Sequence, residues 1–224
     1  MAGKQQTALA DDRARALKLV SVSRETQERL DRYVELLLTW QRTTNLIAPS
    51  TAAEIWTRHV ADSAQLLELA SPRTQTWIDI GSGGGFPGLV IACALAPPAM
   101  VHLVESNAKK AAFLREAVRV TGVSAQVHAQ RIEDYVQTFQ AQADVVTARA
   151  VAPLSTLLGY VQPLVERGAQ ALLLKGQDVE RELTDAAKYW RIEADLVPSK
   201  TDSRARIVVV RKVSRALGAD IAAP

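Results

Sequence analysis

The sequence predicts an α/β fold, in which a mostly parallel twisted sheet carries helices on both faces and is preceded by an N-terminal helical cap. From Thr76 onward, strand-like and helix-like segments alternate along the chain, which is the pattern of parallel strands joined by helices. The strand-like segments are short apolar runs, as expected of strands buried on both faces. Five of the eleven glycines lie between residues 81 and 88, directly after the first of these strands.

The composition is that of an ordinary globular protein. The 224 residues are 48% hydrophobic and 23% charged, and the net charge is only +3. A single cysteine, Cys93, excludes an internal disulfide and a cysteine-cluster metal site, and three scattered histidines suggest no other metal. The longest apolar stretch, 89–101, contains two prolines and is too short for a bilayer, and the N-terminus lacks a signal-peptide pattern. We expect a soluble cytoplasmic monomer with no metal and no membrane partner.

The first 72 residues predict mainly helices. Residues 1–22 are polar, Ala-rich and unpatterned, and we expect a flexible N-terminal extension there. Ser23 offers an N-cap, and apolar residues at helical spacing predict a helix from there to about residues 40–45. A second helix is expected over about 52–69, before Ser71-Pro72. Residues 23–72 are therefore the predicted helical cap.

Residues 73–213 are the predicted main domain, and residues 214–224 a C-terminal tail. Strands are expected at 76–80, 101–105, 125–129, 143–148, 169–175, 192–197 and 206–212. Helices are expected at 87–95, 108–120, 154–164 and 179–189, with a short turn after the third strand.

The glycine-rich loop after the first strand predicts a nucleotide-like cofactor. A loop in this place lets the backbone approach a ligand closely and aims helix N–H groups at it. The spacing Gly83-x-Gly85-x-x-Gly88 formally matches a dinucleotide fingerprint. The loop begins at Gly81, however, and the frame Asp79-x-Gly81-x-Gly83-x-Gly85 resembles motif I of class I methyltransferases, which bind S-adenosylmethionine (SAM). In that frame Asp79 can assist binding of the cationic methionine end.

Two later positions suit other parts of such a cofactor. Glu105 ends the second strand, where a carboxylate can accept both ribose hydroxyls, although an acid there can also be merely solvated. Ile132 and Glu133 follow the third strand, where methyltransferases hold the adenine through an apolar contact and an acceptor for the amino group. The alternative interpretation of Glu133 is an acid in the first turn of a helix.

The sequence also excludes two classes of methyl acceptor. Residues 147–151 read TARAV, where amino-group methyltransferases of adenine usually carry Asn/Asp-Pro-Pro-aromatic. Methylation of cytosine C5 needs a cysteine nucleophile, and Cys93 lies within an apolar helix as a small core residue. We therefore expect an acceptor that is nucleophilic without covalent help.

Several motifs in order extend the resemblance to most of the chain. They are Asn45-Leu46, WTRHVADS (56–63), WIDIGSGGGFPG (77–88), LVESNAKKAAFL (103–114), QRIEDY, ARAVAPL (148–154) and LLLKG (172–176). Over about residues 25–212 the chain resembles the RsmG (GidB) family. The resemblance implies a Rossmann-like class I SAM-dependent methyltransferase that acts on N7 of a guanine in the decoding-region loop of 16S rRNA. It also implies the assembled small subunit as substrate, and SAM contacts from Gly81, Phe86, Ile132, Glu133 and Arg149.

The implied reaction needs little of the protein beyond positioning. Guanine N7 carries a free lone pair and no proton must leave, so we expect direct in-line transfer without a covalent intermediate or an obligatory general base. No catalytic residue is certain. Arg149 and Lys175, at the ends of the fourth and fifth strands, are the positioning candidates.

Basic residues supply the candidates for RNA contact. Residues 200–215 hold six basic residues and one acid, which form either a solvated face or a patch for RNA phosphates. His59 is expected to be a structural residue hydrogen-bonded to Asp62, in preference to a catalyst. The RNA-binding candidates are Arg58, His59, Lys109, Lys110, Lys175, Arg204 and Arg206.

Three rival functions stay open at this point. The first is a class I methyltransferase of a small molecule or a protein. The second is a nicotinamide-dependent oxidoreductase that uses the shifted glycine frame. The third is a ribosome-binding factor that keeps the SAM fold without catalysis.

Overall fold

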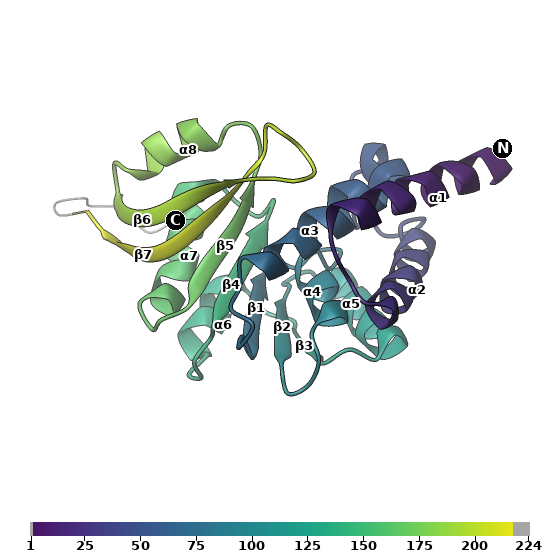
Figure 1. Cartoon of the computed structure of the whole chain (residues 1–224). Helices are drawn as coiled ribbons and strands as arrows, with labels where there is room; N and C mark the ends of the chain where they lie inside the picture. Colours follow the sequence, from purple (N-terminus) through teal and green to yellow (C-terminus); the bar gives the residue numbers. More distant parts are fainter. Residues whose placement is uncertain (1, 217–224) are drawn as a thin grey trace.

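The described part of the chain, residues 2–216 of the computed structural model, is built around a seven-stranded sheet (Figure 1). The strand order is β3-β2-β1-β4-β5-β7-β6. The strands are β1 (Thr76–Ile80), β2 (Met100–Val104), β3 (Ala125–His128), β4 (Val145–Arg149), β5 (Gln170–Lys175), β6 (Trp190–Pro198) and β7 (Arg206–Arg215). The first five strands pair in parallel and β7 is antiparallel to both of its neighbours, which confirms the mostly parallel sheet.

Helices cover both faces of this sheet, as predicted. One apolar core contains α4 (Gly88–Ala94), α5 (Ala108–Thr121) and the cap, and the other contains α6 (Ile132–Thr138), α7 (Leu154–Val165) and α8 (Val179–Ala186). Strand β1 supplies both cores, because its successive side chains point to opposite faces. Trp77 packs in the first core, whereas Ile78 and Ile80 pack in the second.

The cap follows the prediction in α2 and departs from it in the segment after α2. Helix α2 (Arg24–Trp40) begins at the predicted N-cap, where the Ser23 hydroxyl accepts a hydrogen bond from the Thr26 N–H. The next segment is not one regular helix. It consists of short 3₁₀, π and α turns, namely η1 (Pro49–Glu54), η2 (Trp56–Ala61), α3 (Asp62–Ala64) and η3 (Gln65–Glu68). A π turn of this kind is rare and is often found at functional sites.

The expectation of a flexible extension is wrong for residues 2–19, which form the helix α1 (Ala2–Leu19). Its Asp12 is fully buried, and the carboxylate accepts hydrogen bonds from the Trp56 N–H (2.8 Å) and the Thr57 hydroxyl (2.6 Å). Arg13 pairs with Asp31 of α2 at 2.7 Å. A side chain of α1 therefore caps the first turn of η2, whose leading N–H groups have no partner within their own helix. This tertiary contact orders a segment that has no strong local pattern.

Two further differences concern the second half of the chain. Helix α6 occupies the place where a short turn was expected, and it buries Tyr135 and Val136 against the sheet. Strand β7 runs to Arg215, so residues 214–215 belong to the sheet and not to a tail. The rest of the predicted tail, 217–224, lies outside the described residues. None of the helices within 2–216 has the length and apolar character needed to cross a bilayer.

The contact between α1 and η2 predicts a measurable loss of stability in Asp12→Ala. Removing the carboxylate leaves a buried N–H and a hydroxyl without acceptors, which costs about 1–3 kcal/mol. Urea unfolding followed by circular dichroism measures the change. The neighbouring Asp11 is exposed, so Asp11→Ala is the matched control and should unfold like the wild type. Equal midpoints for the two variants would contradict the capping role of Asp12.

Candidate active site

The glycine loop, residues 81–87, connects β1 to α4 at the carboxyl end of the sheet. Gly81 has φ of +69°, and a Cβ there would lie 2.5 Å from Val151 Cγ2. Gly88, at the start of α4, has no room for a side chain either, because a Cβ would lie 2.6 Å from Asp79 Cβ. The cap supports the loop from the other side, where the buried Tyr33 hydroxyl donates to the Gly84 carbonyl oxygen. The loop is therefore held in one conformation by both parts of the molecule.

A cavity of about 340 Å³, here called the loop cavity, opens above this loop. Glu105 lies at its edge, where Oε2 accepts from the Gly83 N–H (2.8 Å) and Oε1 from the Asn107 N–H (2.7 Å). The carboxylate thus joins the loop to the N-cap residue of α5 while each oxygen keeps a further lone pair. The predicted site residues that line the loop cavity are Gly81, Gly83, Phe86, Glu105, Lys110, Ile132 and Arg149. Leu46 of the cap also lines it, although the sequence analysis gave this residue no role at a binding site.

Three predicted cofactor residues do not line the loop cavity: Asp79, Gly85 and Glu133. Asp79 is 1% exposed and lies beneath the loop, where its carboxylate accepts from the Gly88 N–H (3.1 Å) and the Thr147 hydroxyl (2.9 Å). Burial raises the pKa of Asp79 to about 6. Asp79 therefore fixes the start of α4 against β4. Glu133 is exposed in the first turn of α6.

Arg149, at the end of β4, connects the sheet to the cap. Its guanidinium donates to His59 Nδ1 (2.6 Å) and to the Arg58 carbonyl oxygen (3.1 Å), and it lies 3.6 Å from Asp62 Oδ2. The same group stacks 5.0 Å from the centre of the Phe86 ring. The Arg149 side chain is only 17% exposed, so these cap groups supply most of its partners.

The predicted hydrogen bond between His59 and Asp62 is not formed, because Arg149 lies between them as a shared partner. Since a guanidinium can only donate, His59 Nδ1 accepts and the ring proton resides on Nε2, which donates to Thr51 Oγ1 at 2.7 Å. Burial and the charge of Arg149 lower the pKa of His59 to about 3. His59 is therefore neutral and is held by Arg149 and Thr51 in place of Asp62, while its contact with RNA stays a prediction.

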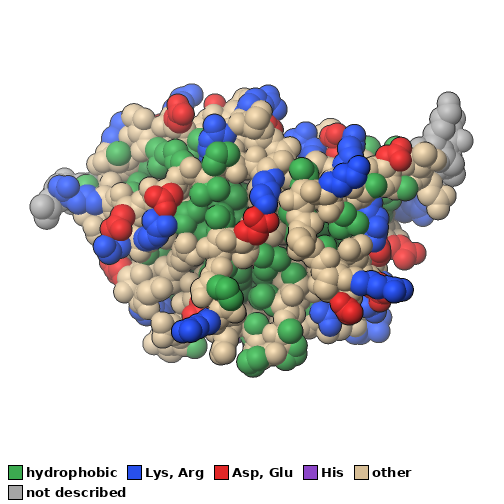
Figure 2. Space-filling model, viewed as in Figure 1, with side chains coloured by type: hydrophobic (Ala, Val, Ile, Leu, Met, Phe, Trp, Pro, Cys, Tyr) green, Lys and Arg blue, Asp and Glu red, His purple; other side chains and the backbone are tan. Residues whose placement is uncertain are grey.

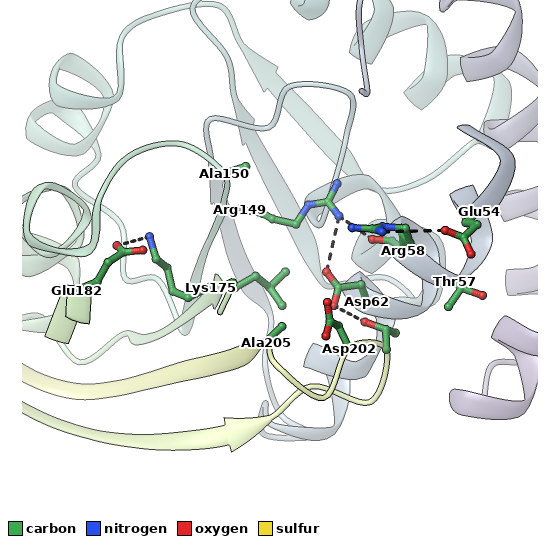
Figure 3. Close-up of a pocket in the computed structure, with 13 residues that line it drawn as sticks. Glu54, Thr57, Arg58, Asp62, Arg149, Ala150, Lys175, Glu182, Asp202 and Ala205 are labelled. Atoms are coloured by element: carbon green, nitrogen blue, oxygen red, sulfur yellow. Dashed lines mark hydrogen bonds and ion pairs between the residues drawn. The ribbon is translucent and has the colours of Figure 1, made fainter. Parts of the chain in front are cut away.

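A second cavity of about 400 Å³, here called the outer cavity, lies beyond Arg149 (Figure 3). Arg149 and Ala150 line both cavities and so form the wall between them. Ala150 has φ of +54°, a conformation that costs a non-glycine residue about 1–3 kcal/mol and that is concentrated at functional sites. The other lining residues come from the cap, the end of β5, helix α8 and the connection between β6 and β7.

Lys175 and Arg58 reach the outer cavity from opposite sides. Figure 3 shows Lys175 turned toward Glu182, with which it forms a 2.6 Å ion pair, and its amino group also donates to the Ala152 carbonyl oxygen. Arg58 lies toward Glu54, with 4.0 Å between the charged atoms. Contact of either side chain with RNA stays a prediction.

The basic run near the C-terminus is largely paired with acids. Among the described residues the pairs are Lys200–Glu68, Arg204–Asp202, Arg211–Asp195 and Lys212–Glu193. Arg206 donates to the carbonyl oxygens of Ser203 and Ala205. On the face shown in Figure 2, Lys and Arg side chains accordingly lie beside Asp and Glu and do not form a continuous basic field. Lys109 is exposed on the first turn of α5.

Solved structures share this architecture. A putative O-methyltransferase from Klebsiella pneumoniae aligns with a TM-score of 0.60 at 14% identity, covering 93% of this chain and 99% of that one. The O-methyltransferase from Bacillus cereus in complex with SAH aligns with a TM-score of 0.60 at 14% identity, covering 92% and 99%. The fold, with its glycine loop after β1, is that of a class I SAM-dependent methyltransferase.

The particular family follows from the sequence matches. The model of the GidB family, rRNA small subunit methyltransferase G, matches residues 26–208, and the chain belongs to this family. A Bradyrhizobium protein named Ribosomal RNA small subunit methyltransferase G is 59% identical over 209 residues, covering 92% of this chain and 94% of that protein. A Rhodopseudomonas palustris protein of the same name is 60% identical over 202 residues, covering 89% and 86%. The cofactor is SAM. This excludes the rival function of a nicotinamide-dependent oxidoreductase.

The low pKa of His59 predicts how stability depends on pH. In the unfolded chain His59 takes up a proton near pH 6.5, whereas in the folded chain it does so only near pH 3. Protonation of the unfolded chain therefore lowers the free energy of unfolding as the pH falls through that range. The loss approaches about 1.4 kcal/mol per pH unit. His59→Gln should show a shallower fall in unfolding free energy between pH 6 and 4. Thr51→Val keeps the imidazole and should keep the steeper fall; identical slopes in all three proteins would refute the assignment.

Glu105→Gln should weaken SAM binding by about 10- to 100-fold, because hydrogen bonds to a charged group contribute about 1.5–3 kcal/mol. The amide would also present a donor where two backbone N–H groups already point. Titration calorimetry with SAM measures the affinity. The control is Glu116→Gln, which changes an acid on α5 that is paired with Arg119 away from the cavity. Unchanged affinity in Glu105→Gln would remove this residue from the cofactor site.

Proposed function

We propose that this protein transfers the methyl group of SAM to N7 of a guanine in the decoding-region loop of 16S rRNA. We propose further that it acts in the cytoplasm, as a monomer, on the assembled small ribosomal subunit. The observation that carries the proposal is the pair of adjoining cavities separated by Arg149, in a chain of the rRNA small subunit methyltransferase G family. Two relatives are named as small-subunit rRNA methyltransferases, and their alignments with this chain cover 94% of each relative.

The residues of the loop cavity fit SAM chemically. A side chain at Gly81 would collide with Val151, which lines the cavity, and Glu105 offers free lone pairs for ribose hydroxyls. Ile132 supplies an apolar contact suited to adenine, and the Phe86 ring adds another. SAM, when bound, supplies an activated methyl group on a cationic sulfur.

The protein needs to position the acceptor and does not need to remove a proton from it. Guanine N7 has a free lone pair, and its methylation releases no proton from the base. His59 is consistent with this, since Nδ1 is occupied by Arg149 and Nε2 by Thr51. Cys93 is fully buried in α4, and burial raises the pKa of its thiol to about 12, so it is not a nucleophile. Arg149, fixed by the cap, is the positioning group nearest both cavities.

A labelling experiment tests the reaction and its substrate together. Small subunits from cells lacking this protein are incubated with purified protein and methyl-labelled SAM, with naked 16S rRNA in parallel. Reduction followed by aniline cleavage then locates N7-methylguanine. We expect one new cleavage in the decoding-region loop, and more label on subunits than on naked RNA.

The other outcomes identify the rival functions. SAM binding without label on either RNA would reject the proposal and favour a small-molecule or protein acceptor. SAM binding without transfer to any acceptor tested would favour a ribosome-binding factor that keeps the fold as a scaffold. Label at another position of the guanine would retain the rRNA substrate and reject N7.

A further inference from the structure

The three groups that hold Arg149 come from one short segment of the cap, residues 58–62. They are the Arg58 carbonyl oxygen, His59 Nδ1 and the Asp62 carboxylate, of which the first two belong to η2. In Figure 3 the Arg149 side chain reaches from the sheet toward this segment. One of the three groups is a backbone atom, which moves only when η2 itself moves. The position of the Arg149 guanidinium therefore depends on the position of η2.

The local sequence does not explain the conformation of η2. This segment is a π turn, a form that is rare in proteins and that short-range patterns seldom select. Its N-cap residue, Ile55, is apolar and has no side-chain acceptor to offer. The leading N–H groups of a helix have no partner within the helix, so they need acceptors from elsewhere. Contacts from outside the segment are therefore needed to fix η2.

Asp12 of α1 supplies these contacts. Its Oδ2 accepts from the Trp56 N–H (2.8 Å) and the Thr57 N–H (3.3 Å), and its Oδ1 accepts from the Thr57 hydroxyl (2.6 Å). The next residue, Arg13, places its guanidinium 5.1 Å from the centre of the Trp56 ring. Figure 1 shows α1 lying alongside this part of the cap. Helix α1 thus holds the first turn of η2 through a fully buried carboxylate and a stacked guanidinium.

The link from α1 reaches the loop cavity only through other residues. Arg149 lines this cavity and stacks on Phe86, whereas no described residue of α1 lines the loop cavity or the outer cavity. Helix α1 also precedes residues 26–208, the part of the chain that the family model matches. An effect of α1 on a ligand in the loop cavity must therefore pass through η2 and Arg149.

We propose that Asp12 is a positioning residue for the SAM site. It fixes η2 to α1, and η2 in turn holds Arg149 at the wall of the loop cavity. Helix α1 thereby raises the affinity of the protein for SAM. The proposal rests on the assignment of the loop cavity to SAM within the function proposed above, and it is independent of the methyl acceptor.

Titration calorimetry with SAM, at a temperature where circular dichroism shows each variant to be folded, compares two contacts of α1. Asp12→Ala removes the link to η2 and should weaken SAM binding by about fivefold to tenfold, within the range seen for residues that act on a site from a distance. The matched control is Asp31→Ala, which removes the ion pair between α1 and α2 but leaves the link to η2 in place. This half-exposed pair contributes little, so the dissociation constant should change by less than about twofold.

The possible failures of this titration are distinguishable. Equal dissociation constants for Asp12→Ala and the wild type would overturn the proposal and leave the function intact. Equal weakening by Asp12→Ala and Asp31→Ala would also overturn it, because the effect would then follow from loosened docking of α1 in general. No SAM binding by the wild type would instead overturn the assignment of the loop cavity, and with it the proposed function.

A double-mutant cycle separates positioning from a general loss of structure. Substitutions along one chain of contacts are not additive, so Asp12→Ala should change the SAM dissociation constant by less than about twofold once Arg149→Gln is present. A merely structural role would give the same factor in both backgrounds. The full factor in the double variant would therefore show that Asp12 does not act through Arg149.

Thr57→Val tests the link from the side of η2, and it also serves if Asp12→Ala does not fold. Valine has nearly the same shape, but Asp12 Oδ1 loses the hydroxyl donor at 2.6 Å. Thr57 does not line the loop cavity, so a direct contact with SAM is not removed. We expect the SAM dissociation constant to rise by about twofold to fivefold. Wild-type affinity in Thr57→Val would contradict the role of this link.

Discussion

The burial of the Arg149 guanidinium is the constraint on which the site depends. A charged group removed from water is costly unless other groups replace the lost hydrogen bonds and charge. The sheet supplies few such groups at the end of β4, and the cap supplies three: His59 Nδ1, the Arg58 carbonyl oxygen and the Asp62 carboxylate. The position of the cap is therefore not independent of the sheet. Where the cap docks, Arg149 is fixed, and the wall between the two cavities is fixed with it.

The glycine loop is held by a similar use of buried polar groups. Asp79 lies beneath it and bonds to Gly88, Glu105 bonds to Gly83 from the neighbouring strand, and Tyr33 of the cap bonds to Gly84. Each of these partners comes from a different element. A loop rich in glycine is thereby kept in a single shape, as a site that must hold a ligand in one orientation requires.

The sequence predicted best those elements whose signals are local. The strands β1, β2, β4 and β5 are largely buried apolar runs, the N-cap at Ser23 is a local hydrogen bond, and the glycine loop has a recognisable spacing. Helix α1 was missed because its ordering depends on Asp12 meeting η2 more than forty residues away. The proposed bond from His59 to Asp62 used the spacing of one helical turn, and the actual partner, Arg149, is ninety residues away from His59. Periodicity and propensity hold no information on contacts of this kind.

The same limit applies to the basic run near the C-terminus. Six basic residues within 200–215 left open a solvated face or a patch for RNA phosphates, and the fold brings Glu68, Asp195 and Glu193 against three of them. These pairs are exposed, and exposed ion pairs contribute little to stability because water screens them and long side chains lose entropy. They lower the field of the free protein without fixing the side chains firmly. The side chains of Arg149 and Asp62, by contrast, are only 17% and 15% exposed, so this pair is screened less by water. The molecule thus combines a site whose charges are fixed with a surface whose charges can exchange partners.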